Sequence, residues 1–191
     1  MSVVVTDKKR SKTALAEVEA VLFTKEQIAT RVKALAREIN RDYKGKNLFI
    51  VGILKGSFMF LADLLRELKV PAELDFMSLT SYEGEKSMGM VHLNFDIKKD
   101  IRDRHVLLVD DIVDTGFSLV FARKHLLSKG PKSLSLAVLL DKAEKRKVLV
   151  PIRYVGFTIG DRFVVGYGLD YNERFRELAF IGVLKNDTLR P

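Results

Sequence analysis

Short apolar runs and longer amphipathic stretches alternate along this chain. The apolar runs with the length and composition of strands are 48–54, 72–79, 106–109 and 133–140. Shorter strands are expected at 90–95, 154–157 and 163–166. Amphipathic stretches with helical spacing lie at 24–39, 58–68 and 120–128, and a short additional helix is expected over 14–21. This order predicts one α/β domain with a central, mainly parallel sheet flanked by helices.

The most distinctive stretch, 106–119, joins a strand to a helix. Its apolar part, 106–109, has the uninterrupted β-favouring pattern of a strand buried on both faces. Carboxylates, a turn and a helix start follow, in the order Asp110, Asp111, Asp114, Thr115, Gly116, Phe117, Ser118 and Leu119. Because ligands of open α/β sheets sit at the carboxyl ends of the strands, we expect the active site here.

The two halves of this loop favour different parts of one ligand. The hydroxyls, the glycine and the helix start suit a phosphate group, because a helix N-terminus offers N–H groups and positive partial charge. Asp110 and Asp111 repel phosphate, but they accept hydrogen bonds from hydroxyl groups or hold a hard cation such as Mg²⁺. A sugar phosphate satisfies both halves. The simpler alternative is that the acids cap the helix and Gly116 only turns the chain.

Two other loops carry weaker signals. Lys55 and Gly56 lie between a strand and a helix, which suits either a second anion site or an ordinary surface lysine. The polar stretch 80–89 has no apolar period, so it is either an exposed hairpin loop or a lid that excludes water.

The composition narrows the class of protein. The 191 residues suit a single domain with a sizeable core, and 47% hydrophobic with 30% charged residues is typical of a globular protein. No apolar run reaches the roughly 18 residues of a membrane span, and no signal-peptide core is apparent. The absence of cysteine excludes disulfides and thiolate chemistry. A cytoplasmic location is therefore expected.

The formal net charge of +8 raises the question of nucleic acid. Part of it comes from a basic cluster at Lys8, Lys9, Arg10 and Lys12. We interpret 1–13 as a mobile basic arm and 14–191 as the folded domain. Elsewhere basic and acidic residues are interleaved, as on a solvated surface, and no aromatic-basic binding motif stands out. A highly anionic small substrate explains the positive charge as well as a nucleic acid would, and we expect no nucleic-acid partner.

The stretch at 106–119 resembles the phosphoribosyl-pyrophosphate (PRPP) motif of type I phosphoribosyltransferases: an apolar strand, two acids, two apolar residues, then Asp-Thr-Gly. Tyr154 to Phe157 and Phe163 to Tyr171 look like the purine-recognising segment of the hypoxanthine-guanine phosphoribosyltransferases. The resemblance covers about 21–184 and implies the type I fold. It also implies a small purine-binding hood, mainly 151–191 with part of the N-terminal region, and a flexible lid at about 80–89 that includes Ser81 and Tyr82.

The resemblance implies transfer of a 5-phosphoribosyl group from PRPP to hypoxanthine or guanine, giving IMP or GMP and pyrophosphate. It implies that Asp110 and Asp111 bind the ribose hydroxyls and Mg²⁺, and that 114–119 bind the 5-phosphate. Asp114 would also lie against purine N7 as the general base. The implied pyrophosphate ligands are Lys55, Gly56 and Arg176.

Four residues have implied roles around the base. Lys142 would donate to the purine 6-oxo group, because an ammonium can only donate and pairs poorly with the exocyclic amine of adenine. Without the resemblance, Lys142 reads as one more surface lysine. Phe163 would stack on the purine and Val164 would pair with it through its main chain. Asp170 would complete this side of the site and hold a second Mg²⁺ on the pyrophosphate.

Two positions depart from the family pattern. Phe117 stands where relatives often carry Lys, Arg or Asn, and Asp110 stands where many carry Glu. The phosphate-binding turn relies mainly on main-chain groups, and Asp110 is still an acid. We therefore expect these contacts to be tuned rather than lost.

The resemblance also suggests a homo-dimer or homo-tetramer, and two alternative functions stay open. One is a phosphoribosyltransferase that prefers xanthine, which no side chain here settles. The other is a PRPP-sensing regulatory protein on the same fold, in which the basic arm would be the site for nucleic acid. Asp114, Lys142 and Phe163 together argue against the regulator, because a sensor of PRPP needs no base pocket.

Overall fold

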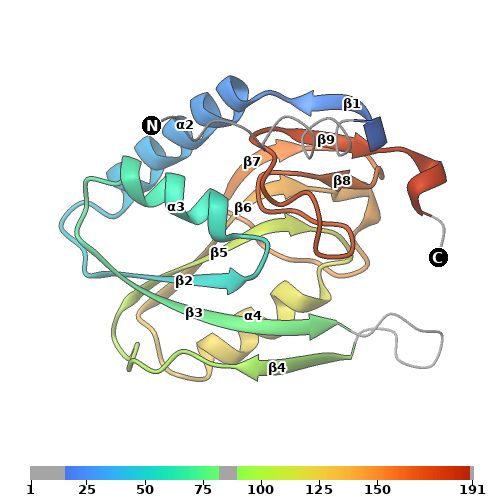
Figure 1. Ribbon diagram of the computed structural model, residues 1–191. Coiled ribbons are helices and arrows are strands. Elements are labelled where there is room, and N and C mark those ends of the chain that lie inside the picture. Colours follow the sequence, from blue (N-terminus) through green and yellow to red (C-terminus); the bar gives the residue numbers. More distant parts are fainter. Residues whose placement is uncertain (1–15, 82–89, 190–191) are drawn as a thin grey trace, which may run out of the picture.

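The computed structural model describes residues 16–81 and 90–189, and a six-stranded sheet forms their centre (Figure 1). Its strands, in spatial order, are β4 (Val91–Phe95), β3 (Ala72–Ser81), β2 (Leu48–Leu54), β5 (His105–Val113), β6 (Ser133–Asp141) and β7 (Tyr154–Thr158). Neighbouring strands are parallel except β3 and β4, which are antiparallel. The α/β fold with a mainly parallel sheet is therefore confirmed.

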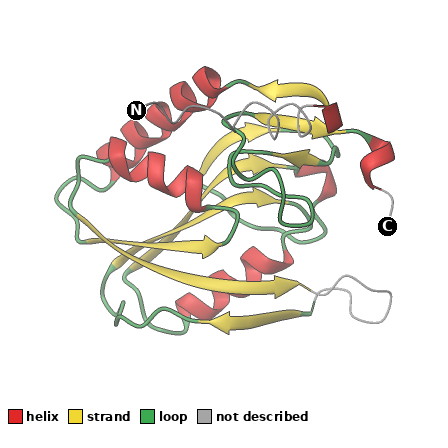
Figure 2. Cartoon of the chain, in the orientation of Figure 1, coloured by secondary structure: helices red, strands yellow, loops and turns green. Residues whose placement is uncertain are grey.

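Helices cover both faces of this sheet (Figure 2). The helices α2 (Lys25–Asp42) and α3 (Phe58–Glu67) lie on one face, and α4 (Phe117–Leu127) lies on the other. The start of α2 has the expected capping box: Gln27 N donates to Thr24 Oγ1 at 3.3 Å, and Thr24 N donates to Gln27 Oε1 at 2.8 Å. The apolar faces of the helices pack onto the sheet as two separate cores.

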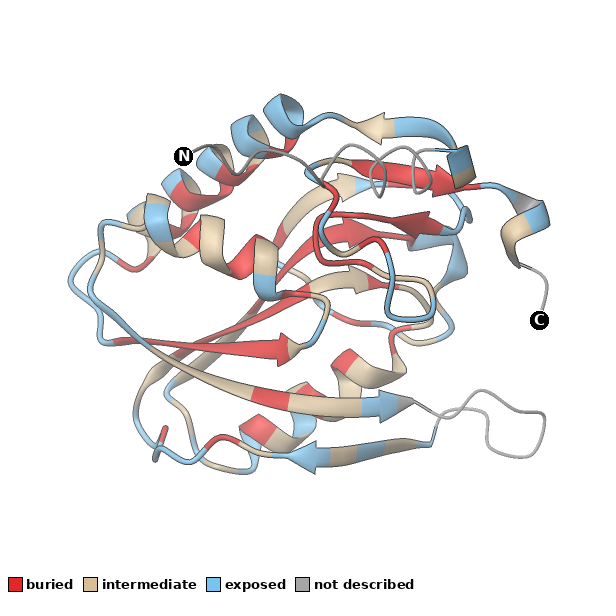
Figure 3. Cartoon of the chain, in the orientation of Figure 1, coloured by how far each residue is buried: buried red, intermediate tan, exposed pale blue. Residues whose placement is uncertain are grey.

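The central strands are buried on both faces, as Figure 3 shows. Successive residues of β2 point to opposite sides, so Leu48 and Ile50 pack with α2 and α3 while Phe49 and Val51 pack with the core beneath α4. This rigid centre fixes the positions of the loops at the carboxyl ends of β2, β5 and β6. The polar residues of interest lie in those loops.

A second, three-stranded antiparallel sheet has the order β1 (Val18–Phe23), β9 (Ile181–Leu184) and β8 (Val164–Val165). It lies on the side of the large sheet that carries α2 and α3, towards the carboxyl ends of the strands (Figure 1). Ile181 and Val183 join the core beneath α2 and α3, which attaches the small sheet to the large one. Two short 3₁₀ helices, η1 (Ala143–Lys145) and η2 (Asn186–Leu189), complete the described elements.

The helix expected over 14–21 is wrong from Val18 on, although residues 16–17 are helical. The chain forms strand β1 there, because Val21 pairs with Gly182 of β9 and Phe23 stacks on Phe157 with ring centroids 3.9 Å apart. These partners lie far along the chain, so tertiary pairing overrides the weak local preference for a helix.

Several other boundaries differ from the prediction. Strand β5 continues through the acids to Val113, because Asp110 and Ile112 still pair with β6. Helix α4 starts at Phe117, three residues before the expected Val120. The strand expected at 154–157 exists in full as β7, whereas the one expected at 163–166 is reduced to Val164–Val165 of β8; β7 belongs to the large sheet and β8 to the small one.

Some of the predictions concern residues that the structure does not describe. The basic arm at 1–13, Tyr82 and most of the expected lid lie outside the described residues. None of the helices at 16–81 or 90–189 is long and apolar enough to cross a membrane.

Candidate active site

A cavity of about 510 Å³ lies at the carboxyl ends of the central strands. Its walls come from the turn after β2, the ends of β3, β4, β5 and β6, and the segment that follows β7. The residues expected in the site that line it are Lys55, Gly56, Asp111, Asp114, Lys142, Phe163, Val164, Asp170 and Arg176. The structure therefore brings together residues that span more than half of the sequence.

The turn after β2 lies directly against the acids of β5. The peptide bond between Leu54 and Lys55 is cis. A Cβ atom on Gly56 would lie 1.8 Å from Asp111 Oδ2, so the backbone approaches the carboxylate more closely than any other residue would allow. Gly168 in turn leaves only 2.2 Å between its ideal Cβ position and the Gly56 carbonyl oxygen. Glycines thus let three chain segments converge beside one carboxylate.

The two consecutive acids of β5 have different surroundings. Asp110 is buried, with 7% of its surface exposed, and Asp111 N donates to its Oδ1 at 3.0 Å. Burial, and after it the charge of Asp111, raises the pKa of the Asp110 carboxyl well above its ordinary value. Burial also raises the pKa of Asp111, although its own hydrogen bonds and the Arg176 cation oppose this. Asp111 lines the cavity, whereas Asp110 is not part of that lining.

Replacing Asp110 with Asn is expected to stabilise the ligand-free protein. A carboxyl with a raised folded-state pKa supports folding while protonated, and this contribution is lost as pH rises through the folded pKa. Asn stays neutral, so its Tm advantage over the parent should be larger near about pH 8 than near about pH 5. Each kcal/mol of added unfolding free energy raises the Tm by about 2–4 °C in a chain of this size.

Thermal unfolding at the two pH values checks this, with Glu19→Gln as a control at an exposed site on β1. A Tm of Asp110→Asn equal to or below the parent's at the higher pH contradicts it.

The turn between β5 and α4 includes Gly116 with φ of +90°. The first helical hydrogen bond runs from Val120 N to Gly116 O at 3.0 Å, and the N–H groups of the preceding turn are the kind that bind phosphate. Lys147 N donates to Thr115 O at 3.0 Å, which ties the turn to the chain after η1. The expected phosphate residues 115–119 thus lie together, beside the cavity rather than in its lining.

Gly116→Ala is expected to destabilise the protein by about 1–3 kcal/mol and to weaken binding of a phosphate ligand. A side chain at this φ is strained, and its Cβ would lie 3.0–3.2 Å from atoms of Val148 and Val150. Gly160→Ala is the matched control, because a Cβ there would meet nothing within 4 Å. Chemical denaturation measures both variants, and equal stabilities would contradict the strain at Gly116.

A cluster of two lysines and two aspartates lies at the end of the cavity near β6, and Lys142 and Asp114 of this cluster line the cavity. Lys142 is buried, with 5% of its surface exposed, and its Nζ lies 3.3 Å from Asp114 Oδ2 and 3.7 Å from Asp161 Oδ1. Lys145 Nζ contacts the same two oxygens at 3.3 Å and 3.1 Å. Asp114 Oδ1 is buried and has no hydrogen-bond partner among the described residues. One oxygen of Asp114 is thus paired with both lysines, and the side chain as a whole is 39% exposed and lines the cavity.

Phe163 and Val164 form an apolar wall beside this cluster. Phe163 is 40% exposed, and the ring of Tyr171 meets the Phe163 ring edge to face with centroids 5.5 Å apart. Val164 pairs with Val183 in the small sheet, which holds its backbone at the cavity edge. An exposed aromatic face next to a buried ammonium suits a flat heterocycle with a carbonyl group.

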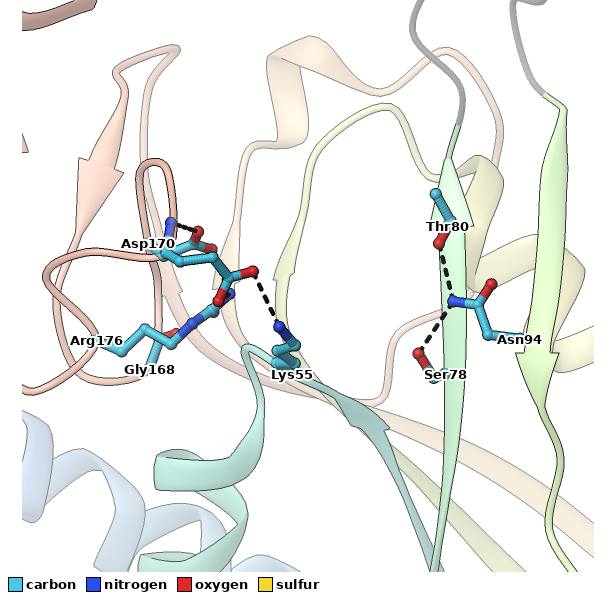
Figure 4. Close-up of polar contacts among 8 residues, drawn as sticks. Lys55, Ser78, Thr80, Asn94, Gly168, Asp170 and Arg176 are labelled. Atoms are coloured by element: carbon cyan, nitrogen blue, oxygen red, sulfur yellow. Dashed lines mark hydrogen bonds and ion pairs between the residues drawn. The ribbon is translucent and has the colours of Figure 1, made fainter.

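The opposite side of the cavity is strongly charged (Figure 4). Arg176 Nη1 donates to Gly168 O at 2.8 Å, and its Nη2 lies 2.9 Å from Asp170 Oδ1. Lys55 Nζ lies 3.0 Å from Glu173 Oε1. Two cations therefore face the cavity here, which suits a ligand with several anionic oxygens.

A wall of neutral polar side chains was not expected from the sequence. Asn94 Nδ2 donates to Thr80 Oγ1 at 2.8 Å and to Ser78 Oγ at 3.2 Å, and all three residues line the cavity across from Lys55 and Arg176 (Figure 4). Ser78 and Thr80 are two residues apart on β3 and thus share a face, which is a signal the sequence did contain. Glu173 was also missed. Ser81 ends β3 next to this wall.

The carboxylates do not form a self-sufficient metal cage. Among the residues described, no group of three or more His, Cys, Asp or Glu side chains is arranged to hold a metal ion. Asp111 and Asp170 nevertheless both line the cavity. Mg²⁺ commonly binds through one or two carboxylates together with substrate phosphates, so this donor set fits an ion that arrives with a phosphate ligand.

Comparison with known proteins identifies the family. The model of the family described as "Phosphoribosyl transferase domain" matches residues 21–172. A hypoxanthine-guanine phosphoribosyltransferase of Dictyostelium discoideum is 45% identical over 172 residues, which cover 87% of this chain and 96% of the relative. The chain belongs to the hypoxanthine-guanine phosphoribosyltransferase family. The family found by these comparisons is thus the one that the motif at 106–119 indicated.

Two further members of this family are similar over nearly their whole length. A hypoxanthine phosphoribosyltransferase of Salmonella typhimurium is 46% identical over 165 residues, covering 85% of this chain and 93% of the relative. The crystal structure of a hypoxanthine phosphoribosyltransferase from Staphylococcus aureus superimposes with a TM-score of 0.90 at 40% identity, covering 94% of this chain and 98% of that one. The type I phosphoribosyltransferase fold is therefore confirmed.

Proposed function

We propose that this protein is a purine salvage enzyme that transfers the 5-phosphoribosyl group of PRPP to hypoxanthine or guanine, with release of pyrophosphate. Similarity over most of the chain to relatives named for this activity supports the reaction. The observation that carries the proposal is a single cavity with two chemically distinct ends. One end presents Lys142 and Phe163, and the other presents Lys55 and Arg176. A flat base and a pyrophosphate would thus lie on opposite sides of one sugar.

The base end suits a 6-oxopurine. The Phe163 ring would stack on the purine, and the main chain of Val164 would pair with its edge. The buried ammonium of Lys142 would donate to the 6-oxo group, which adenine lacks. The carboxylate of Asp114, whose side chain is 39% exposed and lines the cavity, would accept the N7 proton as the new glycosidic bond forms.

The sugar end uses the strand-to-helix loop. Asp110 and Asp111 would hold the ribose hydroxyls, and the turn at Thr115 to Leu119 would cradle the 5-phosphate. The main-chain N–H groups at the start of α4 support this cradle even though Phe117 replaces a more polar residue. Fixed at both ends, carbon 1 of the ribose would face the base, so much of the catalysis is positioning.

The departing pyrophosphate would be stabilised by charge. Lys55 and Arg176 face the cavity and would neutralise it as carbon 1 becomes oxocarbenium-like, while the main chain of Gly56 lies alongside. Asp110 and Asp111 would hold one Mg²⁺ and Asp170 would hold a second, each together with oxygens of PRPP. When bound, Mg²⁺ supplies further neutralisation of the phosphate oxygens.

The residues that line the cavity also bear on the alternative functions. A PRPP-sensing regulator is not favoured, because Asp114, Lys142 and Phe163 line the cavity together, as a base site would require and a sensor of PRPP would not. Relatives are named for hypoxanthine alone or for hypoxanthine and guanine, so activity on guanine stays a prediction and a preference for xanthine stays an untested alternative. A homo-dimer or homo-tetramer, a cytoplasmic location and closure of the Ser81-Tyr82 loop also stay predictions.

The proposal is tested by the stoichiometry of the reaction. PRPP, hypoxanthine and Mg²⁺ are incubated with the protein, and IMP and pyrophosphate are quantified by chromatography. Equal amounts of the two products are expected, with none when hypoxanthine is omitted. Release of pyrophosphate without IMP would show hydrolysis of PRPP instead, and no product at all would refute the enzyme.

A further inference from the structure

Glu173 occupies the space between the two cations at the pyrophosphate end of the cavity. Its Oε1 lies 3.0 Å from Lys55 Nζ, and its Oε2 lies 3.3 Å from Arg176 Nη2. The two cations come from separate parts of the chain, the turn after β2 and the loop after β8. Each carboxylate oxygen thus satisfies a different cation, much as two oxygens of a phosphate group would.

The backbone around Glu173 explains why its side chain points there. Glu173 has φ of +60°, and its N–H donates to Asp170 Oδ2 at 2.9 Å within the turn that Tyr171 and Arg174 close. The contacts with Lys55 and Arg176 lower the pKa of Glu173, so its carboxylate is charged at neutral pH. A negative charge therefore lies where the pyrophosphate of PRPP is expected.

The ion pairs of Glu173 with Lys55 and Arg176 are weak enough for a substrate to replace them. The side chains of Lys55 and Glu173 are 67% and 65% exposed, and exposed ion pairs contribute little to stability. A magnesium pyrophosphate carries more charge and more acceptor oxygens than one carboxylate. Competition between the two would nonetheless reduce the affinity for pyrophosphate, because the Glu173 contacts must be broken first.

We propose that Glu173 is an internal counter-anion that occupies the pyrophosphate subsite in the free enzyme and is displaced by the pyrophosphate group of PRPP. It sets the affinity of this subsite and returns to Lys55 and Arg176 when product pyrophosphate leaves. The inference rests on the proposed function, since it takes these two cations as the pyrophosphate ligands. Glu173 is thus a residue that tunes binding, and no bond to the substrate is assigned to it.

The test is the binding of inorganic pyrophosphate with Mg²⁺, measured by isothermal titration calorimetry on the full chain. Glu173→Gln keeps the size of the side chain and removes its charge, so its Kd for pyrophosphate should fall by about 3- to 10-fold. Glu177→Gln is the matched control, because it removes the same charge from an exposed position four residues along the same segment. Its Kd should equal that of the parent.

A second variant, Glu173→Ala, guards against an effect specific to glutamine and should also bind pyrophosphate more tightly than the parent. Unchanged or weaker binding in both variants would overturn the inference, and weaker binding would show that Glu173 helps to hold the ligand.

Turnover of hypoxanthine with PRPP by the parent separates this inference from the proposed function. If the parent makes IMP but the Glu173 variants do not bind pyrophosphate more tightly, the counter-anion role of Glu173 is refuted and the proposed function stands. A parent that neither makes IMP nor binds pyrophosphate refutes both.

Discussion

Asp114→Asn is expected to lower kcat for hypoxanthine by about 100- to 10,000-fold while PRPP still binds. The carboxylate is anchored through Oδ2, which lies 3.3 Å from both Lys142 and Lys145, so its orientation is fixed. The side chain lines the cavity and is 39% exposed, so its carboxylate can take a proton from a bound base. Asparagine has the same shape but cannot act as a base at neutral pH.

Asp161→Asn is the matched control for this prediction. Asp161 contacts the same two lysines, yet it is more exposed and does not line the cavity. Steady-state kinetics on both variants should show a large loss of kcat only at Asp114, with the KM for PRPP within a few-fold of the parent's. Equal losses in the two variants would mean that the lysine cluster, rather than a general base, is what catalysis needs.

Lys142→Met is expected to lower kcat/KM for hypoxanthine by about 10- to 100-fold, the value of a hydrogen bond from a charged donor. Methionine fills a similar volume in this buried position but cannot donate to the 6-oxo group. The KM for PRPP should change little, because Lys142 lies at the base end of the cavity. The preference for hypoxanthine over adenine should shrink by a similar factor.

Lys145→Met controls for the loss of charge beside Asp114. Lys145 contacts the same carboxylates as Lys142, but its side chain is 40% exposed and it does not line the cavity. Competition between hypoxanthine and adenine, followed by chromatography of the nucleotides, compares the two variants. If Lys145→Met loses discrimination as strongly as Lys142→Met, the donor role of Lys142 is wrong.

The parts of the site that lie close together in sequence were predictable. The motif at 106–119 contains its strand, its acids and its turn within one segment, so local pattern was enough to place it at a strand's carboxyl end. Even there, the strand extends beyond Asp111, because β6 continues to pair with it. The sequence concealed this extension because two acids interrupt the apolar run.

The parts that depend on distant segments could not be read from the sequence. The pairing of β1 with β9 joins residues more than 150 positions apart, and without it the stretch at 18–23 has no clear preference for a strand. Glu173 reads as one more surface acid until the fold brings it to Lys55, which is 118 residues away. Asn94 likewise gains meaning only beside Ser78 and Thr80.

The central claim, a site for PRPP joined to a site for a 6-oxopurine, is tested most directly by comparing bases. Initial rates are measured by absorbance with saturating PRPP and Mg²⁺ on hypoxanthine, guanine, xanthine and adenine in turn. We expect turnover of hypoxanthine and guanine and none of adenine, because Lys142 has no acceptor on an exocyclic amine. Turnover of adenine at a rate comparable to hypoxanthine, or of no base while PRPP still binds, would contradict the account.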